Sequence, residues 1–154
     1  MNQRMNKVLV ILGLVIASCS GTEQAGIYMP ENMERREKIR YQQYLVQGKQ
    51  LYQTHCSNCH QTNGQGLAKL YPPLAKSDYL MEDLQRSACI IKFGMEGMIK
   101  VNGTTFQSLM PGVNHLSNLE IAEILTYISN NWGNENGMIS VQETSKFLLE
   151  CEAY

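Results

Sequence analysis

Apolar residues recur with helical spacing in four stretches of the chain, separated by segments rich in glycine and proline. The pattern turns helical at Glu31 and continues through "ENMERREKIRYQQYLVQGKQLYQTHC", where charged residues separate the apolar ones. Residues 80–92 predict a short second helix, for which Asp78 is a reasonable N-cap. The loop at residues 61–79 is therefore expected to join these two helices.

The clearest helix start lies at Ser117, which is followed three residues later by Glu120. This spacing is a capping box, and it opens the helix "NLEIAEILTYISNNW". The apolar stripe of this helix is formed by Ile121, Ile124, Leu125 and Ile128. A break at residues 134–137 precedes a last amphipathic helix, "SVQETSKFLLECEAY". No convincing strand ladder is recognisable, so the predicted fold class is all-α with long loops.

Two turn-rich segments of about 20 residues each lie between these helices, which is unusual in a compact domain. A chain with few helices and long loops needs something large and apolar to pack around. The loop lengths are therefore indirect evidence for a cofactor.

The N-terminal region has the pattern of an export signal. Residues 8–16, "VLVILGLVI", form an uninterrupted apolar run after the basic residues Arg4 and Lys7. Such a run is too short to span a bilayer, which takes about 20 residues, but it suits the middle of a signal peptide.

The tetrapeptide "IASC" at residues 16–19 resembles the bacterial lipobox, in which the cysteine is lipidated and becomes the first mature residue. We therefore expect a lipoprotein signal peptide at residues 1–18 and a tether at residues 19–30, anchored stably by the acyl chains on Cys19. A plain secretory signal with an incidental cysteine is the alternative. Ser20 stands where Asp would indicate inner-membrane retention, which weakly favours the outer membrane of a bacterial envelope, facing the periplasm.

Composition and charge add few constraints. The 154 residues favour a single domain, expected at residues 31–134 with a C-terminal helical extension at residues 135–154. No block of like charges suggests nucleic acid as a partner. Removal of residues 1–18 takes away two of the 13 basic residues and none of the 14 acidic ones, so the net charge falls from −1 to −3.

The stretch "THCSNCH" carries the chemistry, because two cysteines two residues apart are followed directly by His60. A structural zinc site needs four ligands, and neither Cys89 nor Cys151 belongs to a second close pair. A thioredoxin-type dithiol follows a strand, whereas this motif ends a predicted helix. A cysteine nucleophile requires a base and an orienting group, and nothing completes such a triad.

Covalent haem attachment explains the spacing without further assumptions. The thiols of Cys56 and Cys59 would add across the two vinyl groups of one porphyrin, and His60 would become the proximal iron ligand. The distal ligand is expected on a loop far along the chain. Met110 is favoured because Pro111 holds it extended. The other methionines after the motif are Met81, Met95, Met98 and Met138, with Met95 and Met98 the second choices.

Residues 44–134 resemble a single-haem class I cytochrome c. "GKQLYQTHCSNCHQTNGQGL" is similar to the first helix and haem-attachment turn of that family, and "YPPLAKSDYL" to its proline segment. "IKVNGTTFQSLMPG" resembles the distal methionine loop, and "LSNLEIAEILTYISNNWGN" the terminal helix that crosses the first. The motifs occur in the family's order, so the set is specific.

The resemblance implies a cytochrome c fold around one haem c, with iron between His60 and Met110. It implies that the Pro72 carbonyl orients His60, with Pro73 as the fallback. Leu74 and Leu125 would be haem-wall residues. Gly48 would let Tyr127 of the last family helix pack closely on the first helix.

The remaining cysteines and histidines fall outside the family pattern. Because haem would consume two of the four exported cysteines, we expect Cys89 and Cys151 to form a disulfide; two buried free thiols are the alternative. His55 is expected on the surface, and His115 is expected to be a polar loop residue near a helix start.

An iron with His and Met on its two faces has no open position, which favours one-electron transfer over catalysis. We therefore expect a non-enzymatic, membrane-anchored carrier between a respiratory donor and a terminal oxidase or reductase. One alternative is a haem-bearing subunit of a larger oxidoreductase. Another is a gas- or peroxide-binding haem protein with a labile Met110 ligand.

Overall fold

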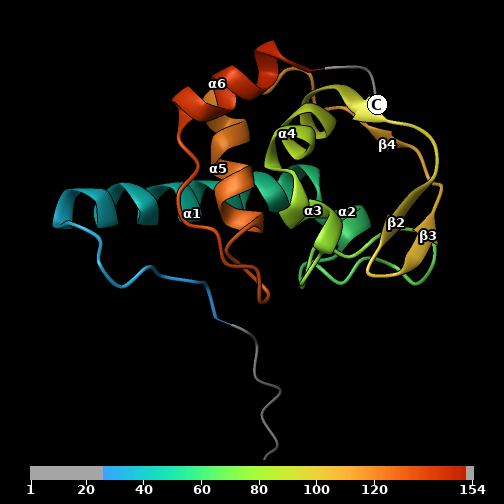
Figure 1. Ribbon diagram of the computed structural model, residues 1–154, viewed down its shortest axis with the longest axis horizontal. Helices are drawn as coiled ribbons and strands as arrows, with labels where there is room; N and C mark the ends of the chain where they lie inside the picture. Colours follow the sequence, from blue (N-terminus) through green and yellow to red (C-terminus); the bar gives the residue numbers. More distant parts are fainter. Residues whose placement is uncertain (1–25, 152–154) are drawn as a thin grey trace, which may run out of the picture.

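A computed structural model describes residues 26–151 of the chain (Figure 1). Six helices account for nearly half of this range, and they surround a buried core of aliphatic and aromatic side chains. The helices are α1 (Arg35–His55), α2 (Ser57–His60), α3 (Asp78–Glu82), α4 (Leu84–Phe93), α5 (Asn118–Ile128) and α6 (Val141–Leu149). The helices joined by long loops that the sequence predicts are present.

The fold is all-α only approximately, because the described residues also form two small antiparallel sheets. The strands are β1 (Gly94–Met95), β2 (Ile99–Val101), β3 (Thr104–Phe106) and β4 (Met110–Pro111), with β1 paired to β4 and β2 to β3. The expectation of no strand ladder was wrong. Strands of two or three residues are too short for the alternating pattern that identifies a strand. Asn102-Gly103, both at positive φ, is nonetheless a recognised hairpin turn signal between β2 and β3.

The central contact of the fold is the crossing of α1 and α5 (Figure 1). A Cβ atom at Gly48 would overlap the Glu123 carbonyl oxygen and lie 2.8 Å from Cβ of Tyr127. The rings of Tyr52, Tyr127 and Trp132 pack beside this crossing, with centroids 5.1–5.5 Å apart. The absence of a side chain at Gly48 thus sets how closely the two helices approach.

Two capping boxes begin the last two helices. The predicted box is confirmed at α5, where Ser117 Oγ accepts the backbone N–H of Glu120 and the Glu120 carboxylate accepts that of Ser117. Ser140 and Glu143 form a second box that begins α6. Each box satisfies two backbone donors that a helix start leaves unpaired.

The single helix predicted at residues 80–92 is two helices in the structure. Asp83 is extended, and its carboxylate accepts the backbone N–H of Arg86 at 2.8 Å. It therefore ends α3 and begins α4. Ser77, and not Asp78, caps α3. An Asp at the N-cap competes well with helix continuation, and this local effect overrode the periodicity.

The segment before α1 is fixed to the body of the protein. The Tyr28 N–H donates to Asn130 O at 2.8 Å, and the Tyr41 hydroxyl donates to Tyr28 O at 2.8 Å. The helix itself begins at Arg35, later than the start at Glu31 that the sequence suggests. A polypeptide arriving from the N-terminus therefore joins the domain beside α1 and the end of α5.

Helix α6 packs on α4 and α5 (Figure 1), and a disulfide joins Cys89 of α4 to Cys151, just beyond α6. Cys89 is fully buried. Thr126 of α5 exchanges hydrogen bonds with the backbone of Ile139, at 3.2 and 3.1 Å, so the segment before α6 is also anchored.

The predicted signal peptide at residues 1–18, the lipidated Cys19 and most of the tether lie outside the described residues. Within residues 26–151, no helix has the length and apolarity needed to cross a membrane.

Gly48→Ala is expected to destabilise the protein, although alanine in an ordinary helix interior is favoured over glycine by about 1 kcal/mol. The added methyl group forces α1 and α5 apart, which lowers the free energy of unfolding by at least about 2 kcal/mol. Chemical denaturation measures this change. Gly26→Ala is the matched control, because a Cβ there meets no atom within 4 Å. Equal stability of the two variants would contradict the close approach.

Cys151→Ser is expected to lower the free energy of unfolding by about 4 kcal/mol on the chain-entropy model, because the cross-link closes a loop with a sequence separation of 62. Reductant should destabilise the wild type and leave the variant unchanged. Mass spectrometry of unreduced protein that finds two free thiols besides Cys56 and Cys59 would disprove the pairing.

Candidate functional site

A cavity with about 610 Å³ of empty space, part of it open to solvent, lies among residues of α2 to α5 and of strands β1, β2 and β4. Its lining is almost wholly apolar and includes Pro72, Leu74, Ile90 and Val101. Such an apolar lining is typical of a cofactor site. Ile124 and Ile128 of α5 line it, whereas Leu125, the expected wall residue, is buried elsewhere in the core.

His60 at the end of α2 contributes an imidazole to the cavity wall. Its side chain is 7% exposed, and Nδ1 lies 3.0 Å from the Pro72 carbonyl oxygen. A carbonyl only accepts, so Nδ1 carries the proton and Nε2 keeps its lone pair. Burial lowers the pKa of His60, against the hydrogen bond to Pro72, which raises it. The imidazole is therefore neutral, oriented and able to ligate a metal.

The loop after α2 brings the Pro72 carbonyl to His60. The Gly66 N–H donates to His60 O at 3.0 Å, and the Gly64 carbonyl accepts the N–H groups of Leu74 and Ala75 at 2.7 and 2.9 Å. At Gly66, with φ of 66°, a Cβ would overlap the backbone of residues 71 and 72. The loop therefore folds tightly back on itself at Gly64 and Gly66, where any larger side chain would clash with neighbouring atoms.

Cys56 and Cys59 are half-buried free thiols, and Cys56 lines the cavity. Burial raises the pKa of the Cys56 thiol to about 12, with a smaller contribution from Cys59. A neutral thiol is a poor nucleophile and a poor zinc ligand. Among residues 26–151, no group of three or more His, Cys, Asp or Glu side chains is arranged to hold a metal ion. These facts argue against the zinc and nucleophile alternatives for the motif.

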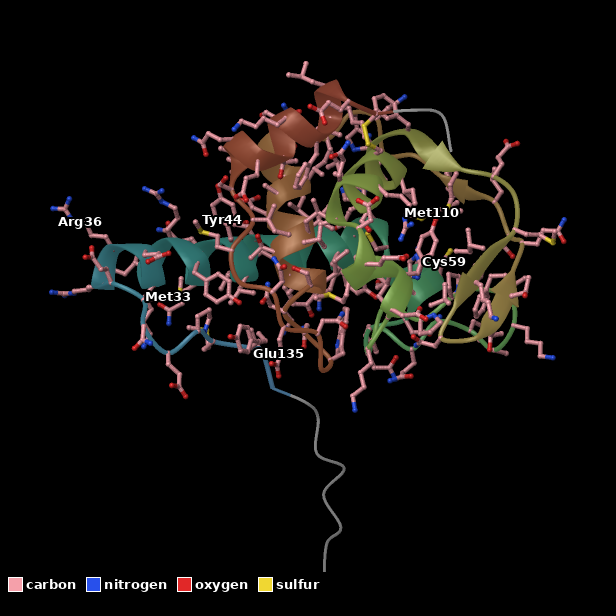
Figure 2. All side chains as sticks on the ribbon, viewed as in Figure 1. Met33, Arg36, Tyr44, Cys59, Met110 and Glu135 are labelled. Carbon is pink, nitrogen blue, oxygen red and sulfur yellow. A yellow bond between two sulfur atoms is a disulfide. The ribbon has the colours of Figure 1, made fainter. Side chains whose placement is uncertain are left out.

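Met110 lines the same cavity from β4, and its ladder partner Met95 lines it from β1. Of the methionines that follow the motif, these two reach the cavity. Met98 is 72% exposed, and Met81 packs against the core cluster. Figure 2 places Met110 and Cys59 at the same end of the molecule, with Met33 and Arg36 at the other.

The chain after Met110 is held on the end of α4. Gly94 pairs with Pro111, and the Val113 N–H donates to Ile91 O at 2.8 Å. Lys92 Nζ donates to the carbonyl oxygens of Asn114 and Leu116 at 2.7 and 2.6 Å. We call residues 112–116 the distal limb. Its anchoring by Lys92 was not predicted, since no local pattern links residues more than 20 positions apart.

The residues present fit a covalently held haem. One thiol of the attachment pair, an oriented imidazole and a thioether line one apolar cavity. Pro72, Leu74, His60, Cys56 and Met110 all contribute to its wall. Cys59 belongs to the same short helix as His60, α2.

Comparison with known proteins identifies the family of this chain. The cytochrome c family model matches residues 45–132. The chain is 34% identical over 90 residues to cytochrome c-552 of Thermus thermophilus, covering 56% of this chain and 68% of that protein. It is 32% identical over 103 residues to the cytochrome c subunit of the quinone alcohol dehydrogenase of Gluconobacter oxydans, covering 64% of this chain but 21% of that subunit.

The chain belongs to the cytochrome c family. It is an electron carrier of that family, whose members hold haem c covalently.

Two histidines outside the family pattern lie together. His55 is half-buried at the end of α1, His115 is exposed in the distal limb, and their ring centroids are 5.4 Å apart. From the sequence, His55 is expected on the surface and His115 in a polar loop, with no link between them. Their proximity depends on the tertiary packing of the distal limb, which no local pattern reveals.

Lys92→Met is expected to loosen the distal limb, because two backbone carbonyls lose a charged donor. The free energy of unfolding should fall by about 1–3 kcal/mol, and amide hydrogen exchange at residues 113–116 should accelerate. Lys69→Met is the control, since Lys69 is exposed and its side chain makes no hydrogen bond or ion pair in the described structure. Unchanged exchange in Lys92→Met would show that the limb is held without this side chain.

Proposed function

We propose that this protein is a membrane-anchored one-electron carrier whose single haem c is bonded to Cys56 and Cys59 and ligated by His60 and Met110. The observation that carries the proposal is the shared cavity, which His60 and Met110 line together with Cys56. When bound, the haem iron supplies a reversible exchange of one electron between its ferric and ferrous states.

The residues of the chain hold and tune that centre. Pro72 fixes the ring of His60 through a 3.0 Å hydrogen bond and raises its basicity as a ligand. The apolar walls exclude water, and the Met110 thioether favours the reduced state, so both raise the reduction potential. With both axial positions filled from the chain, substrates have no open site, which supports electron transfer and not catalysis.

Membrane anchoring is supported by the "IASC" sequence at residues 16–19 and by the place where the chain joins the domain. Tyr28 is tied to Asn130, and residues 26–34 run beside α1, away from the β strands that border the cavity (Figure 1). An anchor on Cys19 would keep the protein at the periplasmic face of the envelope. The end that carries Met110 would remain free to meet partners.

Redox partners are proposed to be a respiratory donor and a terminal oxidase or reductase. Leu67, Leu70 and Leu109 are exposed, and Ser108 Oγ donates to Leu70 O at 2.7 Å, which joins their two loops. Leu109 directly precedes Met110. Such a small apolar surface suits the brief, weak encounters of electron-transfer proteins.

A second candidate is a haem subunit of a larger oxidoreductase, favoured by the similarity to the quinone alcohol dehydrogenase subunits. Co-purification of a stable partner from native membranes would favour the subunit over a free carrier. The gas- or peroxide-binding alternative has less support, because His115 contacts His55 and does not line the cavity.

The test is the optical spectrum of the protein matured with haem-attachment machinery. The oxidised protein should show an iron–sulfur charge-transfer band, which Met110→Ala should abolish while opening the iron to carbon monoxide. Met95→Ala is the control, because it removes the other thioether that lines the cavity and should keep the band. A colourless folded protein would disprove haem binding, and a band that survives in Met110→Ala would disprove this ligand.

A further inference from the structure

His55 and His115 form an edge-to-face pair between two distant parts of the chain. Their ring centroids are 5.4 Å apart and their planes meet at 64°. His55 is the last residue of α1 and directly precedes Cys56. His115 belongs to the distal limb, five residues beyond Met110. The pair therefore joins the haem-attachment segment to the segment that follows the distal ligand.

These two histidines have no role in the proposed haem site. The sequence contains three histidines, and His60 is buried in the cavity wall with Nδ1 engaged by Pro72. Neither His55 nor His115 has a hydrogen bond or ion pair of its side chain in the described structure. The ring nitrogens of both residues therefore have no partner in the described structure.

A carboxylate lies close to the pair. Glu120, in the first turn of α5, has a lowered pKa, chiefly because its carboxylate accepts hydrogen bonds from Ser117. The charges of His115 and His55 lower it further. The Glu120 carboxylate therefore supplies a negative charge near the two imidazoles, which favours a cation.

We propose that His55 and His115 chelate one divalent transition-metal cation of the Zn²⁺, Ni²⁺ or Cu²⁺ class at the protein surface. In tetrahedral zinc sites the nitrogen ligands lie about 2.0–2.1 Å from the metal, which puts the centroids of two bound imidazoles about 5 Å apart. The observed 5.4 Å matches this spacing. Neutral imidazole is a preferred ligand of these metals.

The site has two protein ligands and open positions for water. No third His, Cys, Asp or Glu among residues 26–151 completes a closed site, so binding is reversible and not structural. A bound cation ties the end of α1 to the distal limb, and ligands that bind the native state alone stabilise it by mass action. The proposed metal site rests on the proposed function only in that His60 is taken to ligate the haem iron.

Isothermal titration of Zn²⁺ into the mature, haem-loaded and metal-stripped protein, without a polyhistidine tag, tests the site. The wild type should bind one Zn²⁺, and thermal unfolding should shift to higher temperature. His55→Asn and His115→Asn should each weaken binding at least tenfold, because a lone imidazole does not chelate. The double variant should bind no more weakly than either single variant.

The outcomes separate clearly. If either single variant binds Zn²⁺ as tightly as the wild type, or if the double variant retains the site, the pair is only an aromatic contact and the inference is wrong. The iron–sulfur band and haem content, read in the same samples, should be unchanged in all three variants. Loss of Zn²⁺ binding with an intact band therefore tests this site independently of the proposed haem ligands.

Discussion

The hydrogen bond from His60 Nδ1 to the Pro72 carbonyl is the interaction on which the site depends. It fixes the tautomer and the ring orientation together, so Nε2 of this cavity-lining residue keeps its lone pair. The bond exists because the loop between these residues folds back through Gly64 and Gly66, where side chains have no room. A proline carbonyl suits this role, since the residue restricts its own backbone.

The rest of the fold holds the two sides of the cavity in register. The crossing of α1 and α5 at Gly48 positions the attachment segment, while the C-terminal end of α4 holds the distal limb through β1, Ile91 and Lys92. The two axial candidates thus come from units that meet only in the tertiary structure. Displacement of either unit changes the distance between His60 and Met110, which makes ligand geometry sensitive to packing far from the cavity.

Local sequence signals predicted what local physics decides. The capping box at Ser117 identified the start of α5, because cap and carboxylate lie within one turn. The division of the second helix at Asp83 was not predicted, because hydrophobic periodicity does not show whether an Asp lies inside a helix or caps one. The β2–β3 hairpin had its signal in Asn102-Gly103, but its strands were too short to show a pattern. The cavity lining is what reduces the five methionine candidates to two. No local sequence pattern predicts the contact between His55 and His115.

The disulfide between Cys89 and Cys151 has a consequence for how the protein is made. Under the proposed function, Cys56 and Cys59 must stay reduced until the porphyrin is attached, whereas Cys89 and Cys151 must be oxidised. One chain therefore needs opposite redox treatment of two cysteine pairs within the same compartment. The structure separates them physically, because Cys89 is sealed beneath the last helix while the attachment thiols remain partly accessible. If the C-terminal region closes over Cys89 before haem is attached, Cys56 and Cys59 are the thiols that remain accessible to a haem-loading enzyme.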